Sequence, residues 1–145
     1  MKKVMSLPTG LTQQGQRISG SKYFNKQIIC MTTSEIAKRL YELCSSKLLA
    51  QAQMELYSDD SVSIEPSNAQ WGLMTVKGKK AVMQKGRDFM TLVTEWNGAF
   101  TGQPIIYGSF IFMEMRMDLT VTGLGKINIS EMGKFEVKDG KIISE

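Results

Sequence analysis

The sequence contains no histidine, and this absence excludes several kinds of active site. A Ser-His-Asp or Cys-His catalytic set needs an imidazole, and so does any zinc site that relies on histidine ligands. The two cysteines, Cys30 and Cys44, are too few for a structural zinc centre or a disulfide framework, so we expect reduced thiols in a cytoplasmic protein. The sequence therefore predicts no metal and no other cofactor, and proton chemistry must use Asp, Glu, Tyr, Lys or Cys.

Long apolar runs are also missing, so no membrane span is predicted. Residues 1–31 carry five basic residues and no acidic ones, which leaves 13 basic and 14 acidic residues in the rest of the chain. We expect a basic, loosely ordered N-terminal extension over residues 1–31, or else a translation start at Met31. The domain over residues 32–145 is close to neutral, so it offers no basic face and no nucleic-acid partner is predicted.

Two helices are predicted at the start of this domain. Thr32 and Glu35 have the spacing of a capping box, in which the hydroxyl and the carboxylate each accept a hydrogen bond from a free backbone N–H. Apolar residues then recur at helical spacing, and a second apolar stripe covers residues 48–57. Asp59-Asp60 is expected to end the second helix.

A short strand and a third helix are predicted next. Residues 61–66 alternate, with Val62 and Ile64 on one face, which indicates a short strand. Residues 81–96 carry an apolar stripe typical of a helix, and Asn97-Gly98 is expected to close it.

The last third of the domain is predicted to be β structure. Residues 105–122 and 126–137 form two long strands in this interpretation, followed by a turn at Asp139-Gly140 and a last short strand. The order of elements predicts an α+β fold, with helices packed on one face of a curved antiparallel sheet.

Gly123-Leu124-Gly125 lies between the long strands and suits a three-residue hairpin loop. This loop predicts that Thr122 pairs with Lys126, and that Glu114 meets Lys134 across the strands. The apolar residues of both strands then share one face, whereas a slip of one residue would turn them to the other face.

Glu131 falls on the apolar face in this register, opposite Met117. Gly133 lies beside it, opposite Met115, and is expected to leave empty space there. A carboxylate on a core face is costly unless it is paired, hydrogen-bonded or protonated. One interpretation is a structural acid that is bonded to a buried Tyr or Trp or reaches solvent past the sheet edge. The other is a group that faces a ligand and handles a proton.

Met113, Met115 and Met117 repeat at strand spacing on the same face as Glu131. They suit either ordinary core packing or the adaptable wall of an apolar cavity. Arg116 and Asp118 alternate with them on the opposite face, where a solvated or dimer-contacting surface is expected.

Four segments together resemble the SnoaL-like branch of the nuclear transport factor 2-like superfamily, which includes ketosteroid isomerase. They are Leu56-Tyr57-Ser58-Asp59-Asp60-Ser61-Val62-Ser63-Ile64-Glu65-Pro66, Lys77-Gly78-Lys79, Met115-Arg116-Met117-Asp118-Leu119-Thr120 and Phe135-Glu136-Val137-Lys138-Asp139-Gly140-Lys141-Ile142. The resemblance implies a cone-shaped, cystatin-like α+β barrel, with an apolar pocket between sheet and helices and a homodimer formed through the outer face of the sheet. We expect the pocket to be lined by aromatic and apolar side chains: Tyr57, Trp71, Phe89, Val93, Trp96, Met113, Met115, Met117 and Phe135. Four of them are alternatively core anchors: Tyr57, Trp71, Phe89 and Trp96.

Enzymes of this superfamily commonly place a carboxylate in the pocket, and Glu131 fits that role. The resemblance therefore implies a small hydrophobic ligand and, for an enzyme, cofactor-free isomerisation or aldol-type cyclisation, with Tyr57 or Tyr107 donating to an enolate oxygen. The alternative is a non-catalytic ligand-binding or dimerising module. A further alternative is epoxide hydrolysis, because Arg116 and Asp118 have the spacing of the limonene-epoxide-hydrolase-like set. Asp118 would then be catalytic, and only a β-bulge could bring it to the side of Glu131.

Overall fold

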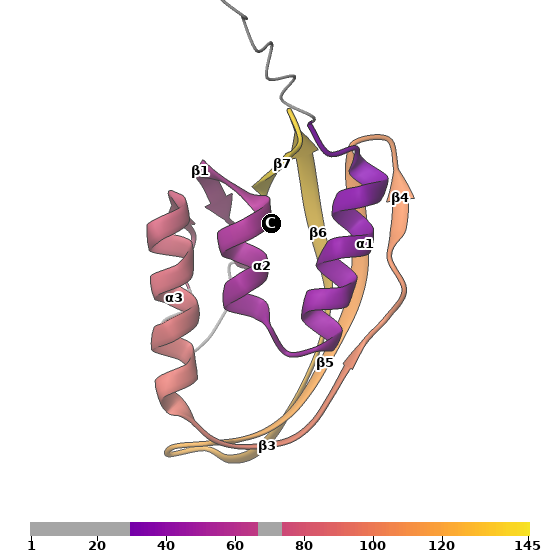
Figure 1. Ribbon diagram of the computed structural model, residues 1–145. Helices are drawn as coiled ribbons and strands as arrows, with labels where there is room; N and C mark the ends of the chain where they lie inside the picture. The colour runs from indigo at the N-terminus through magenta and orange to yellow at the C-terminus, as the bar shows by residue number, and fades with distance from the viewer. Residues whose placement is uncertain (1–29, 67–73) are drawn as a thin grey trace, which may run out of the picture.

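The computed structural model describes residues 30–66 and 74–145, so residues 1–29 of the predicted extension and Trp71 lie outside the described residues. The described chain forms three helices that cover one face of a curved sheet (Figure 1). In chain order the elements are α1 (Thr33–Ser45), α2 (Leu49–Leu56), β1 (Tyr57–Ser63), β2 (Val76–Lys77), α3 (Lys79–Leu92), β3 (Val93–Thr101), β4 (Ile105–Tyr107), β5 (Phe110–Val121), β6 (Gly125–Lys138) and β7 (Lys141–Ser144). The predicted α+β class is confirmed.

Helix α1 opens with the predicted capping box. The Thr32 backbone N–H donates to Glu35 Oε2 at 2.7 Å, and the Glu35 backbone N–H donates to Thr32 Oγ1 at 3.2 Å. The second predicted helix is also confirmed as α2, although it ends at Leu56, and the chain is already extended when it reaches Asp59. The two helices bury Ile36, Leu40 and other apolar residues in the core between helices and sheet.

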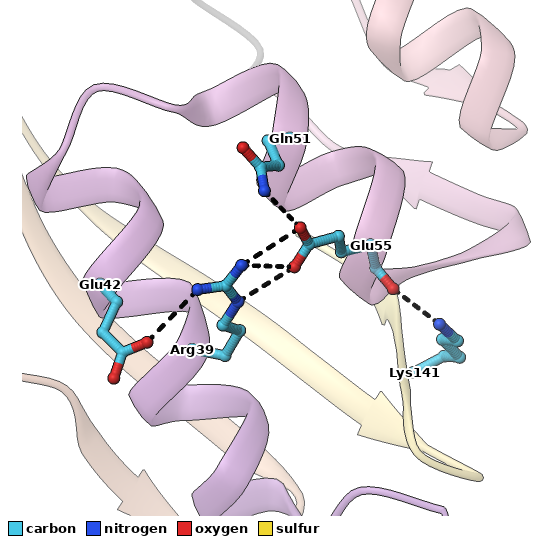
Figure 2. A network of polar contacts seen from close by, with 5 residues as sticks. All are labelled: Arg39, Glu42, Gln51, Glu55 and Lys141. Atoms are coloured by element: carbon cyan, nitrogen blue, oxygen red, sulfur yellow. Dashed lines mark hydrogen bonds and ion pairs between the residues drawn. The ribbon is translucent and has the colours of Figure 1, made fainter.

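A polar network fastens this helix pair to the last strand (Figure 2). Arg39 on α1 donates from Nε to Glu55 Oε2 at 3.0 Å and from Nη2 to Glu55 Oε1 at 3.2 Å. Glu55 lies on α2, and its backbone carbonyl accepts from Lys141 Nζ at 2.6 Å. Gln51 and Glu42 complete the network. Because its members come from α1, α2 and β7, it fixes the helices relative to the sheet.

The sheet is mixed, which corrects the expectation of a purely antiparallel one. Its strand order is β2-β1-β7-β6-β5-β3, with β4 also paired to β5, and β1 runs parallel to β7. Backbone bonds seal this parallel junction: the Glu145 N–H donates to the Val62 carbonyl at 2.9 Å, and the Ile64 N–H donates to the Glu145 carbonyl at 2.8 Å. The prediction was wrong because neighbours in a sequence suggest hairpins, whereas β1 pairs with a strand from the far end of the domain.

The third predicted helix extends too far, because its last predicted residues, 93–96, belong to a strand. Helix α3 ends at Leu92, and the residues from Val93 onward form β3, an edge strand paired with β5. Val93 and Thr94 are β-branched and favour an extended chain, and Trp96 pairs with Leu119 of β5. Pairing along the whole of β3 therefore outweighs the helical spacing of its apolar residues.

Strand β1 turns its serines, rather than its apolar residues, toward the core. Ser61 and Ser63 are buried, whereas Val62 is half-buried and Ile64 is exposed. Ser63 accepts a hydrogen bond from Lys85 of α3, and this polar partner explains why a hydroxyl lies inside.

The β5–β6 hairpin has a three-residue loop, but the loop is Thr122–Leu124, one position earlier than predicted. Val121 pairs with Gly125, so every cross-strand partner shifts by two residues. Glu114 accordingly pairs with Met132 rather than with Lys134. A shift of two leaves each side chain on its predicted face, so Glu131 stays on the core face and now lies opposite Met115.

The space beside Gly133 is filled, which corrects the expected gap. A Cβ on Gly133 would lie 2.8 Å from Cε2 of Phe135 and 3.1 Å from Cε of Met115.

We expect Gly133→Ala to lower the free energy of unfolding by about 1–3 kcal/mol, because the aromatic ring must move. Urea unfolding measures this loss. Gly86→Ala on α3 is the control: its added Cβ meets only the Gln53 side chain at 3.7 Å, so the helix should gain stability. A Gly133→Ala protein as stable as wild type would contradict the close packing.

Candidate functional site

A cavity of about 710 Å³ lies between α2, α3 and the sheet. Its wall is mainly apolar and contains Leu49, Met83, Phe89, Met90, Trp96, Met117 and Ile129, and its polar members include Gln53, Glu65, Lys85, Arg87 and Glu131. A second, smaller cavity of about 160 Å³ adjoins it. The two share Leu49, Gln53, Trp96, Met117 and Glu131, so these five residues form the boundary between them. The volume and the apolar wall suit an organic molecule of moderate size.

Glu131 is the acidic residue that lies at this boundary. Its side chain projects from the core face of β6 but is exposed, because the space in front of it is open cavity. The surrounding protein strips water from the carboxyl and raises its pKa above the ordinary 4.5. Repulsion from Glu65 and Glu145 raises the pKa further, and Lys85 opposes the shift.

No residue in the described ranges, 30–66 and 74–145, donates a hydrogen bond to the Glu131 carboxylate. The interpretation of Glu131 as a structural acid bonded to a buried tyrosine fails for Tyr57, because the Tyr57 hydroxyl donates to Glu145 instead. Within the described part of the chain, the Glu131 carboxylate is therefore available to a ligand.

The raised pKa predicts a pH-dependent effect of removing this carboxylate. A folded-state pKa above the unfolded value means that folding favours the protonated acid, so wild type loses stability as pH rises from about 4.5 through the raised pKa. Glu131→Gln does not titrate, so its stability relative to wild type should rise over that pH window and then level off. Thermal melts at a series of pH values measure the difference. A constant difference from acidic to neutral pH would contradict a raised pKa.

Lys85 and its partners form a second polar feature of the wall, the lysine subsite, made of Ser63, Glu65 and Lys85. Lys85 Nζ lies 2.5 Å from Glu65 Oε1 and also donates to Ser63 Oγ. The three residues come from β1, the segment after it, and α3. Sequence reasoning missed this subsite, although Lys85 stands three residues after Val82 and four before Phe89, on the apolar stripe of the helix.

Tyr57 and Glu145 line the smaller cavity, together with Cys44. Burial raises the pKa of the Tyr57 phenol well above its ordinary value, and the Glu145 carboxylate that accepts its hydrogen bond adds to the shift. Burial also raises the pKa of the Cys44 thiol to about 12. Both groups are therefore neutral at ordinary pH. Tyr107, the other predicted donor, is 78% exposed on β4 and lines neither cavity.

Six of the nine predicted pocket residues line the cavities. Phe89 lines the larger one, Trp96 and Met117 line both, and the smaller one is lined by Tyr57, Met115 and Phe135. Met113 is fully buried in the core, and half-buried Val93 pairs with Val121 outside both walls. Trp71, the ninth, lies outside the described residues.

Asp118 and Arg116 alternate with the core-facing residues of β5 and so lie on the opposite face of the sheet from Glu131, and Arg116 also borders the smaller cavity. Asn97 Nδ2 donates to Asp118 Oδ1 at 3.4 Å, and the Arg116 guanidinium is paired with Glu114 at 2.6 Å. Strands β5 and β6 pair without a register break from Phe110 to Val121, so no bulge in this hairpin turns Asp118 inward. The structure thus does not assemble Arg116, Asp118 and Glu131 into one constellation.

The described residues contain neither a helix suited to span a membrane nor a cluster suited to hold a metal ion. None of the described helices has the length and apolar character needed to cross a bilayer. The same residues contain no cluster of three or more Cys, Asp or Glu side chains arranged to hold a metal ion.

The SnoaL-like domain model matches residues 31–145. Among solved structures, the chain is similar to a Mesorhizobium loti protein described as a candidate SnoaL-like polyketide cyclase, with 29% identity, a TM-score of 0.73, and coverage of 79% of this chain and 96% of that one. No curated protein sequence matches the chain.

Two further structures share the fold and contain small molecules. One is TerC co-crystallised with polyporic acid, at 13% identity, a TM-score of 0.61 and coverage of 77% and 86% of the two chains. The other is a Catenulispora acidiphila protein with a ketosteroid isomerase-like fold in complex with trimethylamine, at 13% identity, a TM-score of 0.57 and coverage of 78% and 83%. With a family model spanning most of its length and a mixed curved sheet covered by three helices, the chain belongs to the SnoaL-like domain family and has the nuclear transport factor 2-like fold.

Proposed function

We propose that this protein binds a small hydrophobic molecule in the larger cavity, and that Glu131 transfers a proton on it in a cofactor-free isomerisation or aldol-type cyclisation. The observation that carries the proposal is the position of Glu131: a carboxylate of raised pKa, at the boundary of two cavities, with no donor among the described residues. The similarity to a candidate polyketide cyclase supports the reaction class. The polyporic acid complex of TerC supports a small organic ligand.

The chemistry follows from the environment of the carboxylate. A desolvated carboxylate is a stronger base than one in water, and it can remove a proton from a carbon next to a carbonyl group. The C–H electron pair then forms a C=C bond, and the carbonyl π pair moves to oxygen to give an enolate. Glu131 returns the proton to another carbon in an isomerisation. In a cyclisation the enolate carbon attacks a second carbonyl carbon, the π pair of that carbonyl moves to its oxygen, and this oxygen takes the proton back from Glu131. No electrons enter or leave in either case.

A ligand screen followed by hydrogen exchange tests the proposal. Steroids, enones and polyketide-like aromatics are screened by thermal shift against wild type and Glu131→Gln. Each hit is then followed by NMR in deuterium oxide, where wild type is expected to exchange the proton next to the carbonyl. If no compound raises the melting temperature of wild type, ligand binding in the cavity is contradicted. Binding without exchange would contradict proton transfer.

The second candidate function is a non-catalytic ligand-binding module. It is favoured by the hydrogen bond from Tyr57 to Glu145, because this bond occupies the hydroxyl that was expected to donate to an enolate. The passive module predicts that ligands stabilise wild type and Glu131→Gln equally and undergo no exchange.

We also propose that the outer face of the sheet pairs with a second copy of this chain. Phe100 and Met132 are 50% and 60% exposed on that face, beside Arg116 and Glu114. Light scattering should give a dimer mass for wild type and a monomer mass for Phe100→Glu combined with Met132→Glu. A monomeric wild type would contradict this proposal.

A further inference from the structure

We propose that Lys85 binds an oxygen atom of the ligand, and that the ligand is an apolar molecule bearing a carbonyl, enolate or phenolate oxygen. This inference rests on the proposed function, since it names the chemical class of molecule that the same cavity takes. It assigns a role to the lysine subsite of Ser63, Glu65 and Lys85.

Lys85 has one N–H donor without an acceptor among the described residues. An ammonium group carries three N–H donors. Ser63 Oγ accepts one and Glu65 Oε1 accepts another at 2.5 Å, and no other residue in the described ranges accepts the third. Because Lys85 also lines the larger cavity, a ligand in that cavity can accept the remaining N–H.

Lys85 is also firmly held. Its side chain is only 12% exposed, and Ser63, which anchors it, is buried. The other cations of the cavity walls are held differently: Arg87 is exposed and donates to Gln84, Lys47 lies over the Trp96 ring, and exposed Arg116 pairs with Glu114, which is not buried. Lys85 is thus the cation in these walls with a buried anchor, and a fixed donor orients a ligand better than a mobile one.

The third N–H of Lys85 favours a particular ligand chemistry. A ligand that fills the cavity removes water from Lys85, and a hydrocarbon would leave its third N–H without a partner. A ligand amine that is protonated would repel the ammonium. An oxygen acceptor satisfies the donor, and one that becomes negative gains most, because a hydrogen bond between charged groups is stronger than one between neutral groups.

The arrangement also matches the proposed proton transfer. Lys85 and Glu131 come from α3 and β6 and line the same cavity. With the carbonyl oxygen at Lys85 and the neighbouring carbon at Glu131, negative charge moves from the carboxylate to the ligand oxygen, where the ammonium stabilises it. The proton goes to Glu131, the electron pair ends on the ligand oxygen, and Lys85 keeps its own protons.

The test uses two probes that differ by one hydroxyl group, nitrobiphenyl and its phenol, hydroxynitrobiphenyl. Wild type is expected to bind the phenol roughly tenfold to a hundredfold more tightly than nitrobiphenyl at a pH where the phenol is ionised. Lys85→Met should lose this preference and keep its affinity for nitrobiphenyl, while Lys85→Arg should retain part of it. Lys80→Met, at an exposed position of the same helix, is the matched control and should behave as wild type.

A second measurement does not depend on the folding of Lys85→Met. In a Glu131→Gln background, absorbance titration gives the pKa of the bound phenol, which should lie below that of the free phenol because Lys85 stabilises the phenolate. Equal affinities for the two probes, an unchanged preference in Lys85→Met, or a bound pKa at or above the free value would each overturn the inference while nitrobiphenyl binding still supported the apolar cavity. If neither probe binds, both the cavity proposal and this inference are overturned.

Discussion

Glu131→Gln is expected to slow proton exchange on a bound ligand by about 10²–10⁴-fold, the usual contribution of a positioned general base. The amide has nearly the shape of the carboxyl, so the cavity wall stays intact and ligand affinity should change little. The loss should therefore appear in the rate of the chemical step rather than in the dissociation constant. Exchange in deuterium oxide, measured at saturating ligand, separates the two.

Asp118→Asn is the matched control for this prediction. It makes the same carboxylate-to-amide change on the opposite face of the sheet, where Asp118 accepts from Asn97 and lines neither cavity. We expect an exchange rate within about twofold of wild type, since a surface substitution away from the site perturbs the free energy by about 0.5 kcal/mol or less. Equal losses in the two variants would contradict a specific role for Glu131.

Met113→Ala is expected to lower the free energy of unfolding by about 2–5 kcal/mol, because Met113 is fully buried in the core and its removal leaves a cavity. Met117→Ala, two positions along the same strand face, should be less costly, since Met117 is half-buried and already borders open space. Ligand affinity should show the reverse order, with Met117→Ala weakening nitrobiphenyl binding and Met113→Ala leaving it unchanged.

Chemical denaturation and ligand titration of both variants test this division of the methionine stripe. A stability loss for Met117→Ala as large as that for Met113→Ala would mean that Met117 packs as core. The pair thus separates the two meanings that the sequence allowed for these methionines, core packing and cavity wall.

The facing of β5 and β6 could be predicted from the sequence because a strand alternates with a period of two. An error of two residues in the register left every side chain on its predicted face, so Glu131 was correctly placed on the core side. The position of β3 could not be predicted in the same way. Its apolar residues continue the helical stripe of α3, and only pairing with β5 makes the chain extended after Leu92.

The polar residues around Glu131 could not be predicted from local sequence patterns. Lys85, Glu65 and Glu145 influence Glu131 from α3, the segment after β1 and the position after β7, and no spacing along the chain connects these places. Two local signals did exist. A lysine on the apolar stripe of α3 and two serines on the inward face of β1 each break the expected pattern, in the same way that exposed Glu131 does on β6.

The parallel junction between β1 and β7 determines when this protein can acquire its site during folding. Contacts between residues far apart in sequence form slowly, because a long loop must close before they contribute. Strand β1 is synthesised early, whereas its parallel neighbour β7 is synthesised only after α3 and the β5–β6 hairpin. We therefore expect the α1–α2 pair to dock on the sheet only after β7 has formed. Lys141 of β7 donates to the carbonyl of Glu55, and Ile142 of β7 pairs with both Tyr57 and Val137. Until that late closure β1 lacks its β7 neighbour, so we expect the smaller cavity, which Tyr57 and Glu145 line, to be completed late in folding.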